Sequence, residues 1–445
     1  MSLPENQEPA TLKLMAEEVL NEARALGATA AEVGIDAQTG LSVSVRLGEV
    51  ETVAHHRDKR LRITLYFGHR KGSASTSDLR PAALQETVRG AASIARYTAA
   101  DPCSGLAEPE LMARDIPELD LCHPWGLSGE EAIAVARRCE EAGRSFDNRI
   151  VISEGAELST RQGYRVYANS HGFLGGYAST RHSLSCVLVA RTEAGMQRDY
   201  WYTRARDWRE MEPAEAVGIK AARRTVARLD PRRLPTGAVP VLFAAEVASR
   251  LFAHFVAAIG GGALYRRSSF LLDHLGKQIF PSFVRLHEQP HLPKALGSAA
   301  FDNEGVATQA RDIVTDGVLQ GYVLGSYAAR KLGMKTTGNA GGVHNLTVDP
   351  GQHDQSALLK QMNRGLLVTE LMGMGVNLVT GDYSQGAAGF WVDKGEIQYP
   401  VSEITLASNL RDMFLGIGEV GTDMEMRGNI RTGSVLIDGM TVAGE

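Results

Sequence analysis

Hydrophobic residues recur at helical spacing near the start of the chain. They lie three or four positions apart, at Leu12, Met15, Val19, Ala23 and Leu26. The pattern stops before Gly27, and a glycine is a common residue just after the last turn of a helix. The stretch therefore predicts a helix that ends at Gly27.

Two further stretches alternate strictly between apolar and polar residues. The first covers residues 41–46, where Leu41, Val43 and Val45 alternate with polar side chains, and the second covers residues 61–67. Alternation with a period of two is typical of strands with one buried face. A helix from Pro81 to about Arg96 follows, since proline is favoured in a first helical turn.

A second unit is expected after residues 101–125, which are rich in proline and acidic residues and lack periodicity. Ser128 and Glu131 then have the spacing of a capping box at the start of a helix. A strand at 184–190 and a basic helix around 213–229 follow. The segment 231–240 contains three prolines, which predicts a linker.

From Val241 onward the sequence predicts short strands, many glycines and hairpin turns. Asp316-Gly317 separates two pairs of apolar residues, a strong signal for a two-residue hairpin turn. A second turn is predicted at 393–396, between the apolar runs 390–392 and 397–399. The C-terminal half is therefore interpreted as a glycine-rich, mainly antiparallel domain.

The predicted fold class is α+β. We expect N-terminal mixed units of antiparallel sheets and helices, and a C-terminal mainly β domain with a few helices. The predicted boundaries are 1–100 for the N-terminal domain, 101–232 for the central domain and 233–445 for the C-terminal domain.

Composition and charge exclude several classes of protein. The chain of 445 residues is 44% hydrophobic and 22% charged, as in ordinary globular proteins, and its formal net charge is −5. A negative chain without a long basic run disfavours direct nucleic-acid binding. The first residues lack a signal-peptide pattern, and no apolar run is long enough to cross a membrane, so we expect a cytoplasmic protein. The four cysteines are widely spaced and are expected to be free thiols.

The segment HEQPH, residues 287–291, has the residue pattern of a zinc peptidase motif. In such a motif, a helix places both histidines on one face, where they bind one metal ion. Here Pro290 lies between them, and proline inside a helix costs roughly 3 kcal/mol. We therefore interpret HEQPH as an exposed polar loop, and the metal site is the less favoured alternative.

Several long segments resemble the TldE/PmbA proteins, the "modulator of DNA gyrase" family. In the C-terminal half and just before it they are STRHSL (179–184), FLLDHLGKQI (270–279), ARKLG (329–333), GNAGGVHN (338–345), VTELMG (368–373) and GDYSQGAAGFWVDKGEIQYPVSEIT (381–405). In the N-terminal half they are RKGSAST (70–76) and YTAADPC (97–103). The resemblance therefore covers nearly the whole chain.

The resemblance implies one subunit of a two-protein cytoplasmic metalloprotease. TldD-type chains carry a helical H-E-x-x-x-H motif and a downstream cysteine as zinc ligands, whereas TldE-type chains lack them. Aligned on that pattern, the first histidine falls on Phe252, the glutamate on Ala253, the second histidine on Ala257 and the cysteine near Ile417. The resemblance thus implies no metal in this chain, and zinc in a TldD-type partner.

The same positions can be judged by their chemistry alone. Zinc needs nitrogen, sulfur or oxygen donors, and these four side chains offer none. Apolar side chains are favourable to bury, so we expect the helix from about Ala245 to Ile259 to be part of the core. His254 in the same helix is interpreted as a hydrogen-bonded core or interface residue.

Three other segments carry candidate sites. The polar, glycine-rich loop around 338–345 could hydrogen-bond a peptide backbone, or could be a tight turn whose side chains cap it; the candidate residues are Asn339, Gly341, Gly342, His344 and Asn345. His171 and His182 lie among several serines, but no G-x-S-x-G motif supports a catalytic triad. The segment RDYWYTRARDWRE (198–210) is basic and aromatic, and we interpret it as an exposed strand and loop or a protein interface.

The predicted function is a subunit that completes the substrate cavity of a TldD/TldE-type metallopeptidase. The resemblance implies unstructured peptides as substrates, including a microcin leader and an antitoxin, and an extended peptide can dock on a sheet edge. The expected partner is a TldD-type subunit, with a homodimer as a further arrangement. The alternatives are an independently active metallohydrolase and a non-enzymatic protein that binds DNA gyrase.

Overall fold

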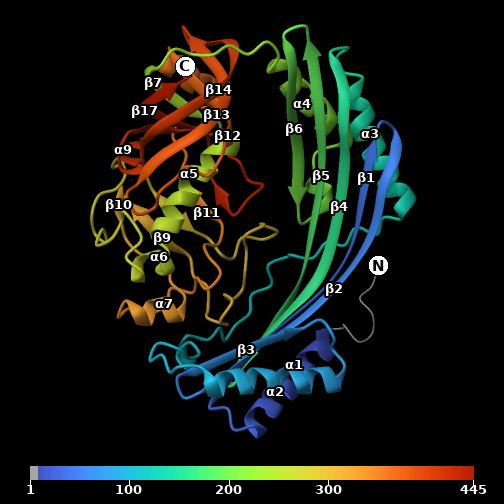
Figure 1. Ribbon diagram of the computed structural model, residues 1–445, viewed down its shortest axis with the longest axis vertical. Helices are drawn as coiled ribbons and strands as arrows, with labels where there is room; N and C mark the ends of the chain where they lie inside the picture. Colours follow the sequence, from blue (N-terminus) through green and yellow to red (C-terminus); the bar gives the residue numbers. More distant parts are fainter. Residues whose placement is uncertain (1–8, 445) are drawn as a thin grey trace.

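One antiparallel sheet of six strands forms the N-terminal half of the computed structural model, which describes residues 9–444. Its order is β3-β2-β1-β4-β5-β6. The strands are β1 (Ala30–Arg46), β2 (Glu49–Phe67), β3 (Arg70–Thr76), β4 (Ile150–Asn169), β5 (Leu174–Thr192) and β6 (Gly195–Ala205). The longest strand has 20 residues, about 65 Å at roughly 3.3 Å per residue. The sheet therefore runs along the length of the molecule (Figure 1).

Four helices cover one face of this sheet in two pairs. Helices α1 (Pro9–Ala25) and α2 (Pro81–Tyr97) pack on one end, and α3 (Gly129–Arg144) and α4 (Ala214–Ala227) pack on the other. Strand β1 contributes to both cores, with Val33 and Ile35 under the first pair and Val43 and Val45 under the second. Because β1 pairs with β4, one continuous sheet joins the first hundred residues to the segment after them.

Five strands of the C-terminal half close into a barrel in the order β14-β13-β12-β7-β17, because β14 also pairs with β17. Strand β15 extends the sheet beyond β17. The strands are β7 (Gly237–Phe243), β12 (Gly365–Met372), β13 (Asp382–Asp393), β14 (Glu396–Asn409), β15 (Ile417–Val420) and β17 (Val435–Ala443). Around it lie the helices α5 (Ala245–Ala258), α8 (Gln355–Met362) and α9 (Leu410–Leu415).

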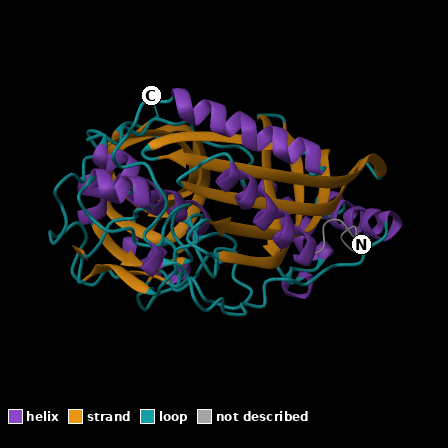
Figure 2. Cartoon of the chain, turned by 90° about the horizontal axis from the view of Figure 1, so that it is seen from below, coloured by secondary structure: helices purple, strands orange, loops and turns teal. Residues whose placement is uncertain are grey.

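A second sheet of the C-terminal half has five short strands, in the order β10-β9-β8-β11-β16. They are β8 (Leu286–Glu288), β9 (Arg311–Thr315), β10 (Val318–Leu319), β11 (Leu346–Val348) and β16 (Ile430–Arg431). The short helices α6 (Gly261–Tyr265) and α7 (Ser326–Lys331) belong to the same half. Most strand pairs are antiparallel, so the α+β prediction with a mainly antiparallel C-terminal half is confirmed. Figure 2 shows the loops of this half beside the long N-terminal strands.

Local sequence signals placed most helix starts and turns correctly. Helix α2 begins at Pro81, and the Ser128 side chain accepts a hydrogen bond from the Glu131 amide at the start of α3. Asp316 and Gly317 connect β9 and β10 with positive φ angles of 51° and 74°, as the hairpin signal predicts. All four cysteines are free. Within residues 9–444 no helix is long and apolar enough to span a membrane.

The linker predicted at 231–240 is too long, because its last residues belong to the barrel. Strand β7 begins at Gly237, and Ala238 and Val239 already pair with β17. The register to β17 shifts between Ile437 and Met440, opposite Pro240. Proline has no N–H to donate to a neighbouring strand, so within sheets it occurs at bulges and edges. Pro240 lies at such an irregularity, and for this reason the prolines of the segment did not exclude a strand.

The HEQPH segment is not a helix, as predicted, and residues 289–291 form a turn with His291 exposed, but the prediction of an exposed loop is wrong for His287 and Glu288. Leu286–Glu288 form β8, the middle strand of the five-stranded sheet, and Glu288 is 1% exposed. Its carboxylate accepts hydrogen bonds from Arg311 Nε at 3.1 Å and Asn339 Nδ2 at 2.7 Å. These partners are distant in sequence, so the local pattern gave no sign that Glu288 would be buried and paired.

Candidate substrate cavity

A cavity of about 990 Å³ lies between the N-terminal sheet and the C-terminal half. One wall is β6 with the end of α4, and the other contains the start of α5, strand residues of the barrel and the segment 423–427. Figure 1 shows β6 at the edge of the sheet that faces the C-terminal half. The volume is at the upper end of the range for small-molecule sites, which also suits a few residues of a peptide.

Strand β6 is an edge strand, because β5 is its only neighbour in the sheet order. Two of the backbone N–H and C=O groups of β6 that point away from β5 are already hydrogen-bonded within the chain. The Tyr200 amide donates to the Asp199 carboxylate at 2.7 Å, and Arg427 Nη1 donates to the Tyr202 carbonyl. Such contacts protect an edge strand from pairing with other chains, and they leave only parts of this edge available.

Trp201 of β6 is surrounded by positive side chains. The guanidinium carbon of Arg427 lies 4.2 Å from its ring centroid, and Arg224 and the Lys220 ammonium each lie 5.2 Å away. Its indole N–H donates to Glu212 at 3.1 Å. These contacts hold the ring in the cavity wall, because cations are attracted to the face of an aromatic ring.

The cavity wall also contains arginine nitrogens without hydrogen-bond partners. Arg431 Nε is buried and makes no hydrogen bond, and burial lowers the pKa of the Arg431 guanidinium. Arg224 Nε is also buried without a hydrogen bond, although it lies 3.5 Å from Asp199 Oδ2. Buried donors are usually satisfied, so these two nitrogens are exceptions, and both are covered by protein atoms.

Glu425 and Arg427 form an ion pair on the same wall. Burial raises the pKa of Glu425, but the hydrogen bonds and the charge of Arg427 outweigh it, so this pKa lies below its ordinary value. Arg427 Nε donates to both Glu425 carboxylate oxygens, at 2.9 and 3.0 Å. Glu425 is therefore ionised at neutral pH and fixes the arginine that reaches β6.

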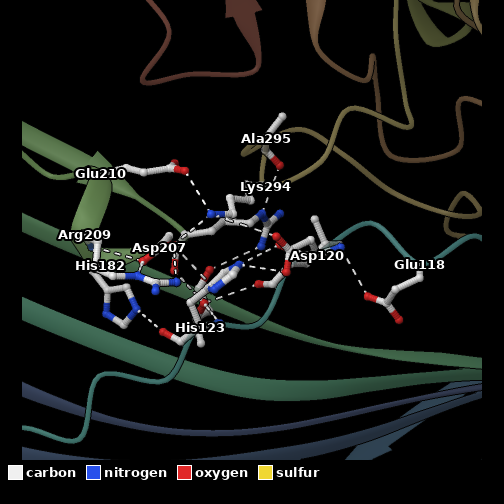
Figure 3. Close-up of polar contacts among 12 residues, drawn as sticks. Glu118, Asp120, His123, His182, Asp207, Arg209, Glu210, Lys294 and Ala295 are labelled. Atoms are coloured by element: carbon white, nitrogen blue, oxygen red, sulfur yellow. Dashed lines mark hydrogen bonds and ion pairs between the residues drawn. The ribbon is translucent and has the colours of Figure 1, made fainter.

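A polar contact at one end of the cavity joins the two halves of the chain (Figure 3). Lys294 Nζ lies 2.9 Å from Asp207 Oδ2, 3.2 Å from Glu210 Oε1 and 4.0 Å from Asp120 Oδ2. Nearby, Arg206 Nε donates to the Ala295 carbonyl at 2.9 Å. Hydrogen bonds from Arg209 and Lys294 hold the pKa of Asp207 far below its ordinary value. The Lys294 loop is thus fixed against the turn that follows β6.

His182 belongs to the structure around this contact and not to a catalytic triad. It is fully buried, shares a hydrogen bond with Thr160 Oγ1 at 2.8 Å, and its Nε2 lies 2.9 Å from the His123 carbonyl (Figure 3). Burial lowers the pKa of His182, which favours the neutral ring. Within residues 9–444 His182 makes no hydrogen bond to a serine hydroxyl, so nothing supports nucleophilic catalysis there.

The four positions aligned with the three zinc ligands and the glutamate divide into two groups. Phe252 and Ile417 are buried, at 0% and 2% exposure, and Phe252 packs 6.2 Å from the ring centroid of Phe280. Ala253 and Ala257 lie on the exposed face of α5. The expectation that the whole helix is core is therefore wrong for these two alanines, because a helix at the surface of a barrel keeps one face open.

The residues present in this region do not fit a zinc ion. The four aligned side chains carry no donor atom, and the nearest imidazole on the helix, His254, is half-buried edge-on to the Tyr383 ring at 6.3 Å. This aromatic contact replaces the hydrogen bond expected for His254, and burial, followed by the charge of Arg250, lowers the pKa of His254. Within residues 9–444, no group of three or more His, Cys, Asp or Glu side chains could hold a metal.

The two histidines of HEQPH are held by different partners. His287 Nδ1 lies 3.0 Å from Asp349 Oδ1, at ion-pair distance but without hydrogen-bond geometry. His291 Nε2 lies 3.0 Å from Thr308 Oγ1. With Glu288 buried against Arg311, His287 and Glu288 belong to a packed sheet, and residues 289–291 form the loop that follows it.

The loop predicted as a peptide-binding candidate is largely used inside the protein. Asn339 is 4% exposed and donates to Glu288, and Asn345 is fully buried and donates to the Gln289 carbonyl and Ser298. Gly341 and Gly342 both have φ of 112°, a region that glycine adopts easily. His344 Nε2 is buried without a hydrogen bond. None of these residues lines the 990 Å³ cavity, and peptide binding by this loop stays a prediction.

The sequence pointed to the strand that became β6, but not to the residues of the C-terminal half that contact this strand and the turn after it. Several residues of the basic, aromatic segment 198–210 line the cavity, and the predicted strand is β6, whereas a protein interface at this segment stays a prediction. Arg427, Arg431 and Lys294 were not singled out. They are isolated cations in unremarkable loops, and only the fold brings them to β6.

Models of the three domains of the PmbA/TldA metallopeptidases match this chain: domain 1 at residues 31–95, the central domain at 122–229 and the C-terminal domain at 236–444. Metalloprotease PmbA of Escherichia coli O157:H7 is 53% identical over 415 residues, which cover 93% of this chain and 92% of the relative. The TldD homolog of Haemophilus influenzae is 22% identical over 89% of both chains.

Solved structures share the fold over nearly the whole chain. A crystal structure from Bacteroides thetaiotaomicron, described as a modulator of DNA gyrase, superposes with a TM-score of 0.93 at 28% identity, covering 98% of this chain and 99% of the other. The structure of TldE from Thermococcus kodakarensis superposes with a TM-score of 0.82 at 19% identity, covering 97% of this chain and all of the other. At that identity the second comparison shows the fold alone.

Proposed function

The chain belongs to the PmbA/TldD metallopeptidase family, and from that premise we propose that it is the TldE-type subunit of a two-protein zinc peptidase. In this role it binds no metal itself. It completes the cavity for an unstructured peptide, and a TldD-type subunit supplies the zinc, the activated water and the general base.

The observation that carries the proposal is the donor chemistry of α5 and β15. Phe252, Ala253, Ala257 and Ile417 stand at the positions aligned with the zinc ligands and the general base, and none offers a lone pair to a metal ion. Phe252 and Ile417 are packed in the barrel core, so no small rearrangement would bring a donor to that point. Family proteins named TldD and TldE both exist, which agrees with such a pair.

The cavity supports the substrate part of the proposal. An extended peptide can add to the edge of a sheet through main-chain hydrogen bonds, which tolerates varied side chains. Strand β6 is such an edge and lines the cavity. Since its Tyr202 carbonyl is already bonded to Arg427, a peptide would take the remaining outward groups of β6. This part of the chain binds and orients the substrate, while proton transfer and hydrolysis take place on the partner.

The test combines the purified chain with a TldD-type subunit and an unstructured peptide. We expect no cleavage and no stoichiometric zinc for this chain alone, and chelator-sensitive cleavage for the mixture. In the mixture, Ala227→Trp places a large side chain in the cavity and should lower kcat/KM at least about tenfold. The matched control is Ala82→Trp, an exposed helical alanine on α2 far from the cavity lining.

Three results would contradict this proposal. Chelator-sensitive cleavage by the chain alone, with zinc lost on His287→Ala, would support an independently active metallohydrolase that uses HEQPH. An unchanged kcat/KM in the Ala227→Trp mixture would remove the cavity from substrate binding. Binding of DNA gyrase by this chain without a TldD-type subunit would favour the gyrase-binding alternative, for which the structure gives no specific support.

A further inference from the structure

The face of the N-terminal sheet opposite the helices carries an unusual group of arginines. Arg161 on β4 pairs directly with Arg181 on β5, and Arg204 on β6 pairs with Ser183, two residues along β5. All three lie on the open face, because their strand neighbours Leu158, Leu184 and Thr203 are buried toward the helices. We name Arg161, Arg181 and Arg204 the arginine row.

No carboxylate lies at ion-pair distance from the arginine row within residues 9–444. Arg198, on the same strand as Arg204, shows the contrast, since its Nε pairs with Glu154 at 2.8 Å. Arg204 instead lies over the Tyr202 ring, 5.4 Å from its centroid. Asp36 and Glu157 line the same hollow, but neither lies at ion-pair distance from the row, which therefore carries three positive charges without a direct ion pair on a chain whose formal net charge is −5.

Like charges on neighbouring strands destabilise a sheet. The effect is visible at Arg181, whose pKa is lowered by burial and then by the positive charges of Arg204 and Arg161. Folding does not need arginines there, because the core of this sheet lies on its other face. An anionic ligand would remove the repulsion, so the row is better explained by binding than by stability.

The surface around the row leaves room for such a ligand. It forms a hollow of about 600 Å³, and its floor carries small side chains such as Ser159 and Ser183. Gly40 pairs with Arg161 from β1 and has no side chain to cover that guanidinium. Arg204 and Arg206 line both this hollow and the main cavity, so the two adjoin at these residues.

We propose that the arginine row binds acidic side chains of the extended peptide that enters the substrate cavity. Three neighbouring strands span roughly 10 Å, and an extended peptide advances about 3.3 Å per residue, so acidic residues two or three positions apart match the row. Guanidinium groups bind carboxylates through paired hydrogen bonds. The inference names a substrate preference and rests on the proposed peptide-binding role of this chain.

The test measures binding to the full chain alone, so it does not depend on cleavage or on a partner. A short fluorescent peptide with glutamate at every second position is titrated by anisotropy, beside the same peptide with glutamine. We expect the acidic peptide to bind at least about tenfold more tightly and to weaken with added salt, as exposed charge contacts do. The triple variant R161Q/R181Q/R204Q should lose that difference, and R161K/R181K/R204K should keep most of it.

A matched control separates position from net charge. Arg24, Arg89 and Arg114 are exposed and lie outside the hollow, and R24Q/R89Q/R114Q makes the same change in net charge. It should bind the acidic peptide as the unchanged chain does. Equal weakening in both triple variants, or equal binding of the glutamine peptide, would overturn the inference. So would single-stranded DNA that competes at the same affinity through the row, since it would show general anion binding. A chain that binds this peptide yet fails to support cleavage would refute only the proposed function.

Discussion

The contact between Lys294 and Asp207 predicts a measurable coupling between the two halves of the chain. The Asp207 side chain is 2% exposed, and its carboxylate accepts from Lys294 Nζ at 2.9 Å and from Arg209 Nη2 at 2.8 Å. The Lys294 side chain is 29% exposed. The pair is therefore intermediate between an exposed ion pair and a buried one.

The magnitude follows from what each variant leaves behind. Lys294→Ala leaves Asp207 bonded to Arg209, so it should lower the free energy of unfolding by about 1–2 kcal/mol. Asp207→Ala also removes the acceptor of Arg209, and we expect a loss of about 2–3 kcal/mol. The double variant should lose about 1–2 kcal/mol less than the sum, above the ~0.2–1 kcal/mol of exposed pairs.

Urea unfolding of the unchanged chain, the two single variants and the double variant gives this coupling energy. The pKa of Asp207 is lowered in the folded state, so its contribution is present above the unfolded value of about 4 and is lost as the pH falls below it. The coupling should therefore be full at pH 7 and smaller in acid. A coupling below about 1 kcal/mol at pH 7 would refute the reasoning, because the contact would then behave as a solvated surface pair.

Three further predictions concern stability. Phe252→Ala should lower the free energy of unfolding by about 3–5 kcal/mol, whereas Ala257→Gln on the open face of α5 should change it by less than about 0.5 kcal/mol in the same urea titration. Gly317→Ala should lower the melting temperature, since the new Cβ would lie 2.1 Å from the Phe280 carbonyl oxygen at a φ of 74°. Burial, then the charge of Glu304, raises the pKa of Asp302 to about 7, so its part of the unfolding free energy should fall as the pH rises from about 4 to 7, and Asp302→Leu should remove that slope.

The sequence predicted what local rules decide. The capping box at Ser128, the proline start at Pro81 and the Asp316-Gly317 hairpin each depend on a few neighbouring residues, and each appears in the structure. Local rules failed where partners are distant. Glu288 looked exposed because Arg311 and Asn339, which satisfy its charge, lie 23 and 51 positions away.

The candidate cavity shows the same limit. Segment 198–210 was noticed for its composition, but its partners Lys294 and Arg427 come from loops that follow it by about 90 and 225 positions. Pairings of this kind come from the topology of the sheets and not from any periodic pattern. A sequence therefore shows which strand is chemically unusual before it shows what that strand faces.

The two faces of the N-terminal sheet explain why chemistry and stability can be separated in this chain. On β5, Leu184 and Cys186 point to the helices and form core, while Arg181 and Ser183 point to the open hollow. The residues on the core side must be apolar to pack against the helices, and this requirement appears in the sequence as alternation of apolar and polar residues. Residues on the open side do not have to pack against helices, so their side chains are explained either by contact with solvent or by a ligand. Solvation alone explains scattered charges of both signs, such as Asp36 and Glu157 in the same hollow, but it does not explain arginines paired across strands with no ion pair to either acid.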